Sequence, residues 1–271
     1  MCFNMVVLNY SPGRRLPEVL VDIVKDEMRI NRHGFSFHAV MGEDDVVLRT
    51  LDPKKYLGEL ENLMKKSPRL LHIHLRLASA GAVNEENIHM WKVANYHVSH
   101  NGSVAGFACA SEPLYQYLYR SSSRPHLPCS NAKSDTRQLI ESSDFVKAID
   151  SLDSKPKELW RVLTKYGFYG VMFMTNKDEV IAISVRKPLY IYATKNTLIF
   201  VNEPIEIVKP VRRFGFTLNL NTVPYTSYKN AMIRYDVARM KPLIFRPKTK
   251  SKPSKLRHDY DFHSQKWPWW W

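Results

Sequence analysis

The chain has 271 residues, 44% of them hydrophobic, and 40 Lys and Arg against 26 Asp and Glu give a formal net charge of +14 at pH 7. That length and apolar content suit one large domain with a tail, and the lack of an 18-residue apolar run or of a secretory signal pattern argues against a membrane or exported protein. Three cysteines cannot form a disulfide framework, so a reducing compartment, the cytoplasm, is expected.

Helices and strands are predicted in alternating blocks along the first part of the chain. Apolar residues at helical spacing predict an amphipathic helix over residues 16–29. Strands are predicted over residues 35–41, 46–51 and 70–78, with a helix over 54–65 between the last two.

The second part of the chain continues in the same way. Two helices are predicted over residues 136–151 and 156–166, followed by a meander of four strands over 168–175, 180–186, 189–193 and 197–201. Helix blocks beside two sets of antiparallel strands indicate an α+β fold.

Two stretches fall outside this pattern. Residues 105–133 contain three tyrosines and a Ser-rich run, and we expect a surface insertion there, or a loop that gates a nearby site. We expect a domain over 1–210 and, over 211–271, a basic extension rich in Pro that ends in four tryptophans. That tail is expected to dock on its own domain, on a protein partner or on nucleic acid.

Cys2 directly follows Met1. Removal of one methionine would leave a thiol and a free α-amine on the same residue. The amine, with an ordinary pKa of about 8, can take the proton of the thiol, directly or through a water. Cys2 is therefore a candidate nucleophile with its own base.

Polar residues share one face of the strand predicted over 70–78. Alternation places His72, His74 and Arg76 on one side and leucines and an isoleucine on the other. A planar guanidinium can hold a carboxylate through two hydrogen bonds, and Asp135 offers the opposite charge that an ammonium group needs.

Several short motifs occur in a fixed order. Residues 74–81 read HLRLASAG, residues 87–89 read NIH, residues 100–102 read HNG, residues 134–136 read SDT, and residues 186–189 read RKPL. With Cys2 in front, their order and spacing resemble the class II glutamine amidotransferases, which are N-terminal nucleophile (Ntn) hydrolases. The resemblance spans residues 2 to about 190 and implies a four-layer αββα sandwich.

The resemblance also implies roles for individual residues. Cys2 would be the nucleophile, and Asn101 and Gly102 would stabilise the oxyanion of a tetrahedral intermediate. Substrate binding would fall to Arg76, Ser79, His89 and Asp135. The implied reaction is hydrolysis of the side-chain amide of glutamine, or of another γ-glutamyl amide. It needs no cofactor and no metal, and a separate enzyme could accept the ammonia.

Three positions depart from the family pattern: Met90 replaces a proline, Leu77 a tryptophan of the larger synthases, and Arg137 an acidic residue. Other classes of function stay open. The domain could be an inactive scaffold, or its charge could mark a nucleic-acid-binding module. Five histidines over residues 72–100 also allow a metal-dependent hydrolase built on His72 and His74.

Overall fold

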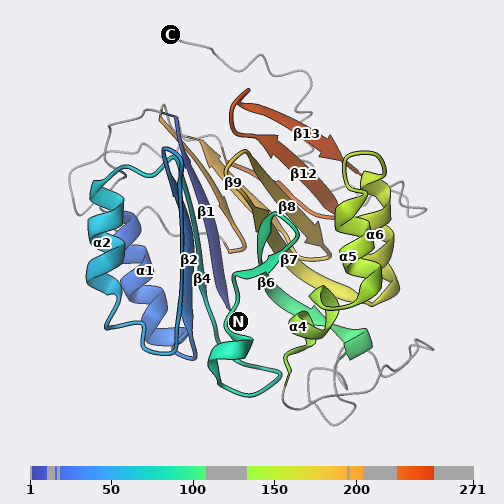
Figure 1. Cartoon of the computed structure of the whole chain (residues 1–271), viewed down its shortest axis with the longest axis horizontal. Helices are drawn as coiled ribbons and strands as arrows, with labels where there is room; N and C mark the ends of the chain where they lie inside the picture. Colours follow the sequence, from blue (N-terminus) through green and yellow to red (C-terminus); the bar gives the residue numbers. More distant parts are fainter. Residues whose placement is uncertain are drawn as a thin grey trace.

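Two antiparallel β-sheets lie face to face, with helices on the outer side of each (Figure 1). This computed structural model describes residues 2–10, 16, 19–107, 133–193, 196–203 and 225–246. The layers run helix, sheet, sheet, helix, so the expected αββα sandwich is confirmed.

The first sheet has seven strands in the order β11-β9-β10-β1-β4-β2-β3. Helices α1 (Val19–Ile30) and α2 (Leu57–Lys65) cover its outer face, where Met5 and Val7 pack against them. The strands are β1 (Phe3–Asn9), β2 (Phe35–Met41), β3 (Asp44–Thr50), β4 (Leu70–Leu75), β9 (Leu189–Ala193), β10 (Thr197–Val201) and β11 (Tyr225–Tyr228).

The second sheet has six strands in the order β13-β12-β8-β7-β6-β5. Helices α4 (Asp135–Ile140), α5 (Ser143–Asp150) and α6 (Pro156–Lys165) pack on its outer face. The strands are β5 (Trp91–Val93), β6 (Tyr96–Val104), β7 (Phe168–Thr175), β8 (Glu179–Val185), β12 (Ala231–Asp236) and β13 (Lys241–Phe245). Two single turns, η1 (Glu85–Asn87) and η2 (Ala105–Phe107), flank β5 and β6 in the chain.

A third hydrophobic cluster fills the space between the sheets. Val6 and Leu8 of β1 point into it from one side, and Val171 and Phe173 of β7 from the other. Because successive side chains of a strand point to opposite faces, β1 contributes to two clusters at once.

The single helix predicted over 136–151 is wrong, because the chain forms α4 and α5 instead. Ser142 separates them. Its Oγ donates to the carbonyl of Leu139 at 2.6 Å and accepts from the backbone N–H of Phe145 at 3.3 Å. The same hydroxyl thus closes one helix and caps the next.

The predicted four-strand meander is also wrong. Strands β7 and β8 pair in the second sheet, whereas β9 and β10 pair in the first. The chain changes sheets between Val185 and Leu189, where Arg186 has a positive φ of 60° and bridges to Gly170.

Several boundaries differ from the expectations. Helix α1 starts at Val19, and β4 ends at Leu75, before Arg76. Strands β11, β12 and β13 come from the expected C-terminal extension and join both sheets, so both sheets continue beyond residue 210. The boundary at 210 itself stays a prediction. Most of the predicted insertion, residues 108–132, and the tail from 247 lie outside the described residues.

Within the described ranges, no helix has the length and apolar character required to cross a membrane.

Candidate active site

Cys2 lies where the start of β1 meets the end of β4. The two strands are antiparallel, and Phe3 pairs with Leu75. One residue further out, the Cys2 Sγ accepts from the backbone N–H of Leu77 at 3.3 Å and contacts the Leu77 carbonyl at 3.5 Å. Burial raises the pKa of the Cys2 thiol, and the Leu77 N–H and the Arg76 guanidinium oppose this.

Asn101 reaches Cys2 from the opposite sheet. Its Nδ2 donates to the Cys2 carbonyl oxygen, which also accepts from the Nδ2 of Asn202 at 3.3 Å. The Asn101 side chain is 1% exposed. The structure therefore brings together two predicted site residues that are 99 positions apart.

Gly102 follows in β6 with a φ of +152°. A Cβ at this position would lie 1.9 Å from the carbonyl oxygen of Tyr169 and 2.7 Å from the Cα of Gly170. Only glycine fits where β6 and β7 come this close. The glycine of the HNG motif thus has a steric basis in strand packing.

Arg76 is buried directly after β4. Its guanidinium donates to the carbonyls of Ala80 at 2.9 Å and Ala82 at 3.0 Å. Burial lowers the pKa of Arg76, while Cys2 and Asp135 act in the opposite direction. The guanidinium thus holds the loop after β4 and lies within electrostatic reach of both groups.

Asp135 is the first residue of α4 and is also buried. Its Oδ2 accepts from the backbone N–H of Val104 at 2.6 Å, and its Oδ1 from that of Thr136 at 2.7 Å. Burial raises the pKa of Asp135, and these hydrogen bonds and Arg76 lower it. The carboxylate is thereby tied to the end of β6, beyond Asn101 and Gly102.

Asn87 connects the loop after β4 to the start of α4. Its Nδ2 donates to the Ala82 carbonyl at 3.0 Å, and its Oδ1 accepts from the backbone N–H of Ser134 at 2.9 Å. Gly81 permits this approach, because a Cβ there would lie 2.5 Å from the Ser134 nitrogen. The HLRLASAG, NIH and SDT motifs therefore form one bonded unit.

Of the other predicted binding residues, Ser79 is exposed in the loop after β4, whereas His89 is buried. The His89 ring stacks on His74 with centroids 3.8 Å apart, and its Nδ1 accepts from the backbone N–H of His100 at 3.1 Å. His89 therefore supports β6 through the backbone of His100.

The departure at Arg137 does not place a free cation at Asp135. The Arg137 guanidinium pairs with Glu86 at 2.5 Å and with Glu141 at 2.8 Å. Of the other two departures, Leu77 contacts the Cys2 Sγ through its backbone, and Met90 has a positive φ of 73° and donates its backbone N–H to the carbonyl of Val98 at 3.0 Å.

His72 and His74, the two histidines considered for a metal hydrolase, make other contacts. Both ring nitrogens of His72 have hydrogen-bond partners, and His74 stacks on His89. Neither belongs to the group of possible metal ligands found in the described part of the chain.

Sequence reasoning missed Asn202 and the backbone N–H of Val104. Asn202 is the first residue after β10, and besides bonding Cys2 it accepts from the backbone N–H of Asn4 through its Oδ1. A polar residue at a strand end is a weak signal, and a backbone group has no sequence signal at all.

Solved structures of larger enzymes have a similar fold. The glutamine phosphoribosylpyrophosphate amidotransferase from B. subtilis, complexed with ADP and GMP, matches with a TM-score of 0.57 and 13% identity, over 90% of this chain and 49% of that one. An allosteric regulatory enzyme of purine biosynthesis matches with a TM-score of 0.57 and 14% identity over the same shares.

The chain thus spans about half the length of these two enzymes. No family model and no curated protein matches the sequence. At such low identity the structural matches establish the fold alone. On that ground the chain has the fold of the class II glutamine amidotransferases, the family that its motifs resemble.

Proposed function

We propose that this domain hydrolyses the side-chain amide of glutamine, or of a related γ-glutamyl amide, with Cys2 as the nucleophile. One observation carries the proposal. The Asn101 amide is hydrogen-bonded to the Cys2 backbone, so a candidate oxyanion donor and a candidate nucleophile from opposite sheets are in contact.

The first step would use the two groups of a processed Cys2. After loss of Met1, the α-amine takes the proton of the thiol, directly or through a water, and Sγ attacks the amide carbon. Burial raises the pKa of the thiol, so an adjacent base is needed to form the thiolate near pH 7.

Asn101 and Gly102 would stabilise the intermediate. The Asn101 amide has two hydrogens, and one of them is taken by the Cys2 carbonyl. The second, with the backbone N–H of Gly102, would serve the developing oxyanion. When the intermediate collapses, ammonia leaves with the proton from the amine, and a γ-glutamyl thioester remains. Water then releases glutamate and the free thiol.

Arg76 and Asp135 would bind the two charged ends of the substrate backbone. A guanidinium has five N–H donors, and the bonds to residues 80–82 occupy three of them. Asp135 would pair with the α-ammonium. Ser79 and His89 belong to the same motifs, with exposed Ser79 the better placed to touch substrate.

We further propose that the ammonia is either released into solution or consumed by a separate acceptor enzyme. The basic C-terminal tail would dock on a protein or on nucleic acid, in the cytoplasm.

The proposal is tested by ammonia release from glutamine, together with the intact mass of the purified protein. We expect a mass without Met1, and activity that is abolished in Cys2→Ala and reduced about 10²–10³-fold in Asn101→Ala. Cys129→Ala is the matched thiol control and should keep full activity.

Other outcomes would favour the alternatives. Retention of Met1 with no ammonia release would favour the inactive scaffold. Full activity in Cys2→Ala would contradict the assigned nucleophile. Activity that a chelator removes but thiol alkylation does not would favour a metal hydrolase.

A further inference from the structure

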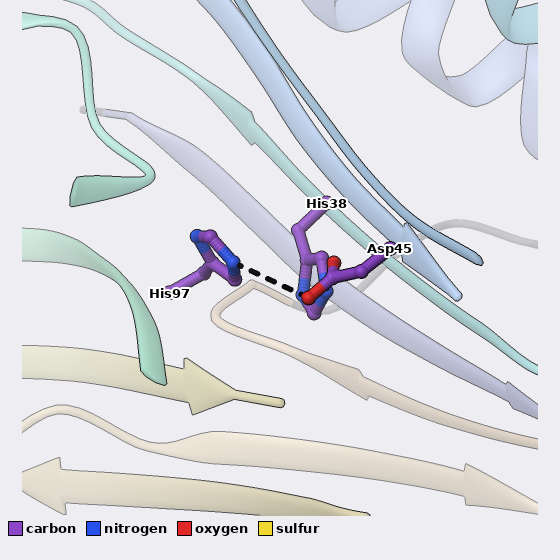
Figure 2. A group of neighbouring side chains, drawn as sticks. All are labelled: His38, Asp45 and His97. Atoms are coloured by element: carbon purple, nitrogen blue, oxygen red, sulfur yellow. Dashed lines mark ion pairs between the residues drawn. The ribbon is translucent and has the colours of Figure 1, made fainter. Parts of the chain in front are cut away.

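Three metal-ligating side chains meet where the β2–β3 hairpin of the first sheet reaches the start of β6 in the second (Figure 2). His38 Nε2 lies 2.6 Å from Asp45 Oδ1, and His97 Nε2 lies 3.8 Å from Asp45 Oδ2. The two imidazole rings are 4.3 Å apart between centroids. The three donor atoms all lie within 4.8 Å of one another, a grouping found nowhere else among the described residues.

A chain of hydrogen bonds behind His38 fixes which of its nitrogens carries the proton. Ser99 donates its hydroxyl proton to Asn4 Oδ1 at 2.8 Å, so its oxygen accepts from His72 Nε2 at 2.6 Å. A neutral His72 then accepts at Nδ1, from the hydroxyl of Thr175 at 2.9 Å.

Thr175 has no second proton to give. Its oxygen therefore accepts from Nδ1 of His38 at 2.7 Å. The proton of a neutral His38 ring is then on Nδ1, and Nε2 presents a lone pair to the Asp45 carboxylate. Two electron-rich atoms in contact require a positive charge between them, which a proton or a metal ion can supply. An Nδ1–H held by an outer partner is the usual arrangement of a metal-ligating histidine.

Burial of the three groups is unequal. His38 is fully buried and His97 is 7% exposed, whereas the Asp45 side chain is 46% exposed. Nδ1 of His97 is buried and has no hydrogen-bond partner among the described residues, so Nε2 is the ring's polar contact. The two rings are thus buried, with His38 anchored by Thr175, and the carboxylate side stays open to water.

We propose that His38, Asp45 and His97 bind a divalent transition-metal ion of the Zn²⁺ class, with water as the fourth ligand. Zn²⁺ takes imidazole nitrogen and carboxylate oxygen at about 2.0–2.2 Å, which sets neighbouring donors of a tetrahedron about 3.3 Å apart. The observed separations of 2.6 and 3.8 Å lie on either side of that value. Asp45 is half-exposed, so its carboxylate has room to rotate and shift both separations towards that value.

The ion would connect the two sheets and stand apart from the Cys2 chemistry. His97 and Asn101 are four residues apart in β6, roughly 13 Å along a strand. The site is therefore a structural link between the β2–β3 hairpin and β6. It departs from the expectation that this chain holds no metal.

The test is Zn²⁺ binding by the full-length protein after removal of metal with a chelator, measured by calorimetry and by the shift in Tm. We expect one ion per chain and a Tm that rises with Zn²⁺. Asp45→Asn and His97→Gln should weaken binding more than about 100-fold and remove the Tm shift. Asp44→Asn, the same charge change on the preceding residue of β3, should bind like the wild type.

The variants distinguish Zn²⁺ binding at His38, Asp45 and His97 from Zn²⁺ binding at Cys2. Asp45 is half-exposed, so Asp45→Asn should fold, and its Tm without metal checks this. Unchanged Zn²⁺ affinity in both Asp45→Asn and His97→Gln would overturn the proposal. So would binding that Cys2→Ser alone removes. An absence of binding by the wild type would mean that a proton, and no metal, bridges His38 and Asp45.

Discussion

Gly102 shows how little room the candidate site leaves for a side chain. A Cβ would lie 1.9 Å from the Tyr169 carbonyl oxygen and 2.7 Å from the Gly170 Cα, both of them backbone atoms that cannot rotate away. We expect Gly102→Ala to lower the free energy of unfolding by at least about 3 kcal/mol, because β6 and β7 must separate. Urea denaturation followed by tryptophan fluorescence measures this.

Gly58 in helix α2 supplies the matched control. A Cβ there meets nothing within 4 Å, and its φ is not in the left-handed region. We expect Gly58→Ala to raise the free energy of unfolding by up to about 1 kcal/mol, since alanine is the better helix former. Equal effects of the two substitutions would contradict the steric argument.

The motif residues of the candidate site were predictable because each has a side chain suited to its chemistry. Cys2 and Asn101 were predicted to act together, and the structure bonds them. His89 was expected to bind substrate, and that role stays a prediction; the structure adds that its ring stacks on His74 and bonds the His100 backbone N–H. Stacking of His89 on His74 depends on how the segment before β5 folds back onto β4, and no spacing along the chain encodes that distance.

Thr175, at the end of β7, joins elements of both sheets through one hydroxyl. It bonds His38 of β2 at 2.7 Å and His72 of β4 at 2.9 Å. Thr175→Val keeps the shape of the side chain but leaves both imidazoles without this partner in a buried place. We expect a loss of about 2–4 kcal/mol in the free energy of unfolding, since each orphaned group costs about 1–3 kcal/mol.

Two other threonine variants test the hydroxyl itself. Thr175→Ser retains the oxygen and should recover most of the stability. Thr164→Val removes an exposed hydroxyl that bonds only within α6, and should change stability by less than about 0.5 kcal/mol. A loss as large in Thr175→Ser as in Thr175→Val would assign the effect to packing.

Alternation predicted β2, β3, β4 and β7 to β10, but not β1, β5, β6, β11, β12 or β13, and it did not predict which strands pair. Residues 189–201 have the pattern of two strands, and β9 and β10 form there. Which sheet they join depends on the turn at Arg186, which has a positive φ. A positive φ at a residue other than glycine cannot be predicted from its residue type. The grouping of His38, Asp45 and His97 depends on the packing of one sheet on the other, so it too had no sequence signal.

Across the described part of the molecule, the buried histidines include His72 and His74 of β4, His89 ahead of β5, and His100 of β6, whose ring packs on Phe168 and bonds Thr136 of α4. Burial lowers the pKa of His74 and of His100 to about 3, and it lowers the pKa of His72 and His89 well below the ordinary value. The four rings are therefore neutral in the folded protein near pH 7. Hydrogen bonds replace water at His72, His89 and His100. Both ring nitrogens of His74 are buried without a hydrogen-bond partner among the described residues, and that ring is held by stacking on His89.

This arrangement predicts a stability that falls as the solution is acidified. Unfolded histidine binds a proton below pH 6.5, whereas folded His74 and His100 do so only near pH 3, so the unfolded state gains protons first. Between pH 6.5 and pH 5 each of the two contributes a loss of about 2 kcal/mol in the free energy of unfolding. Urea denaturation at pH 7, 6 and 5 measures the slope, and His100→Gln should reduce it by about 1.4 kcal/mol per pH unit. A wild-type stability that is flat over this range would show that these rings are protonated in the folded protein.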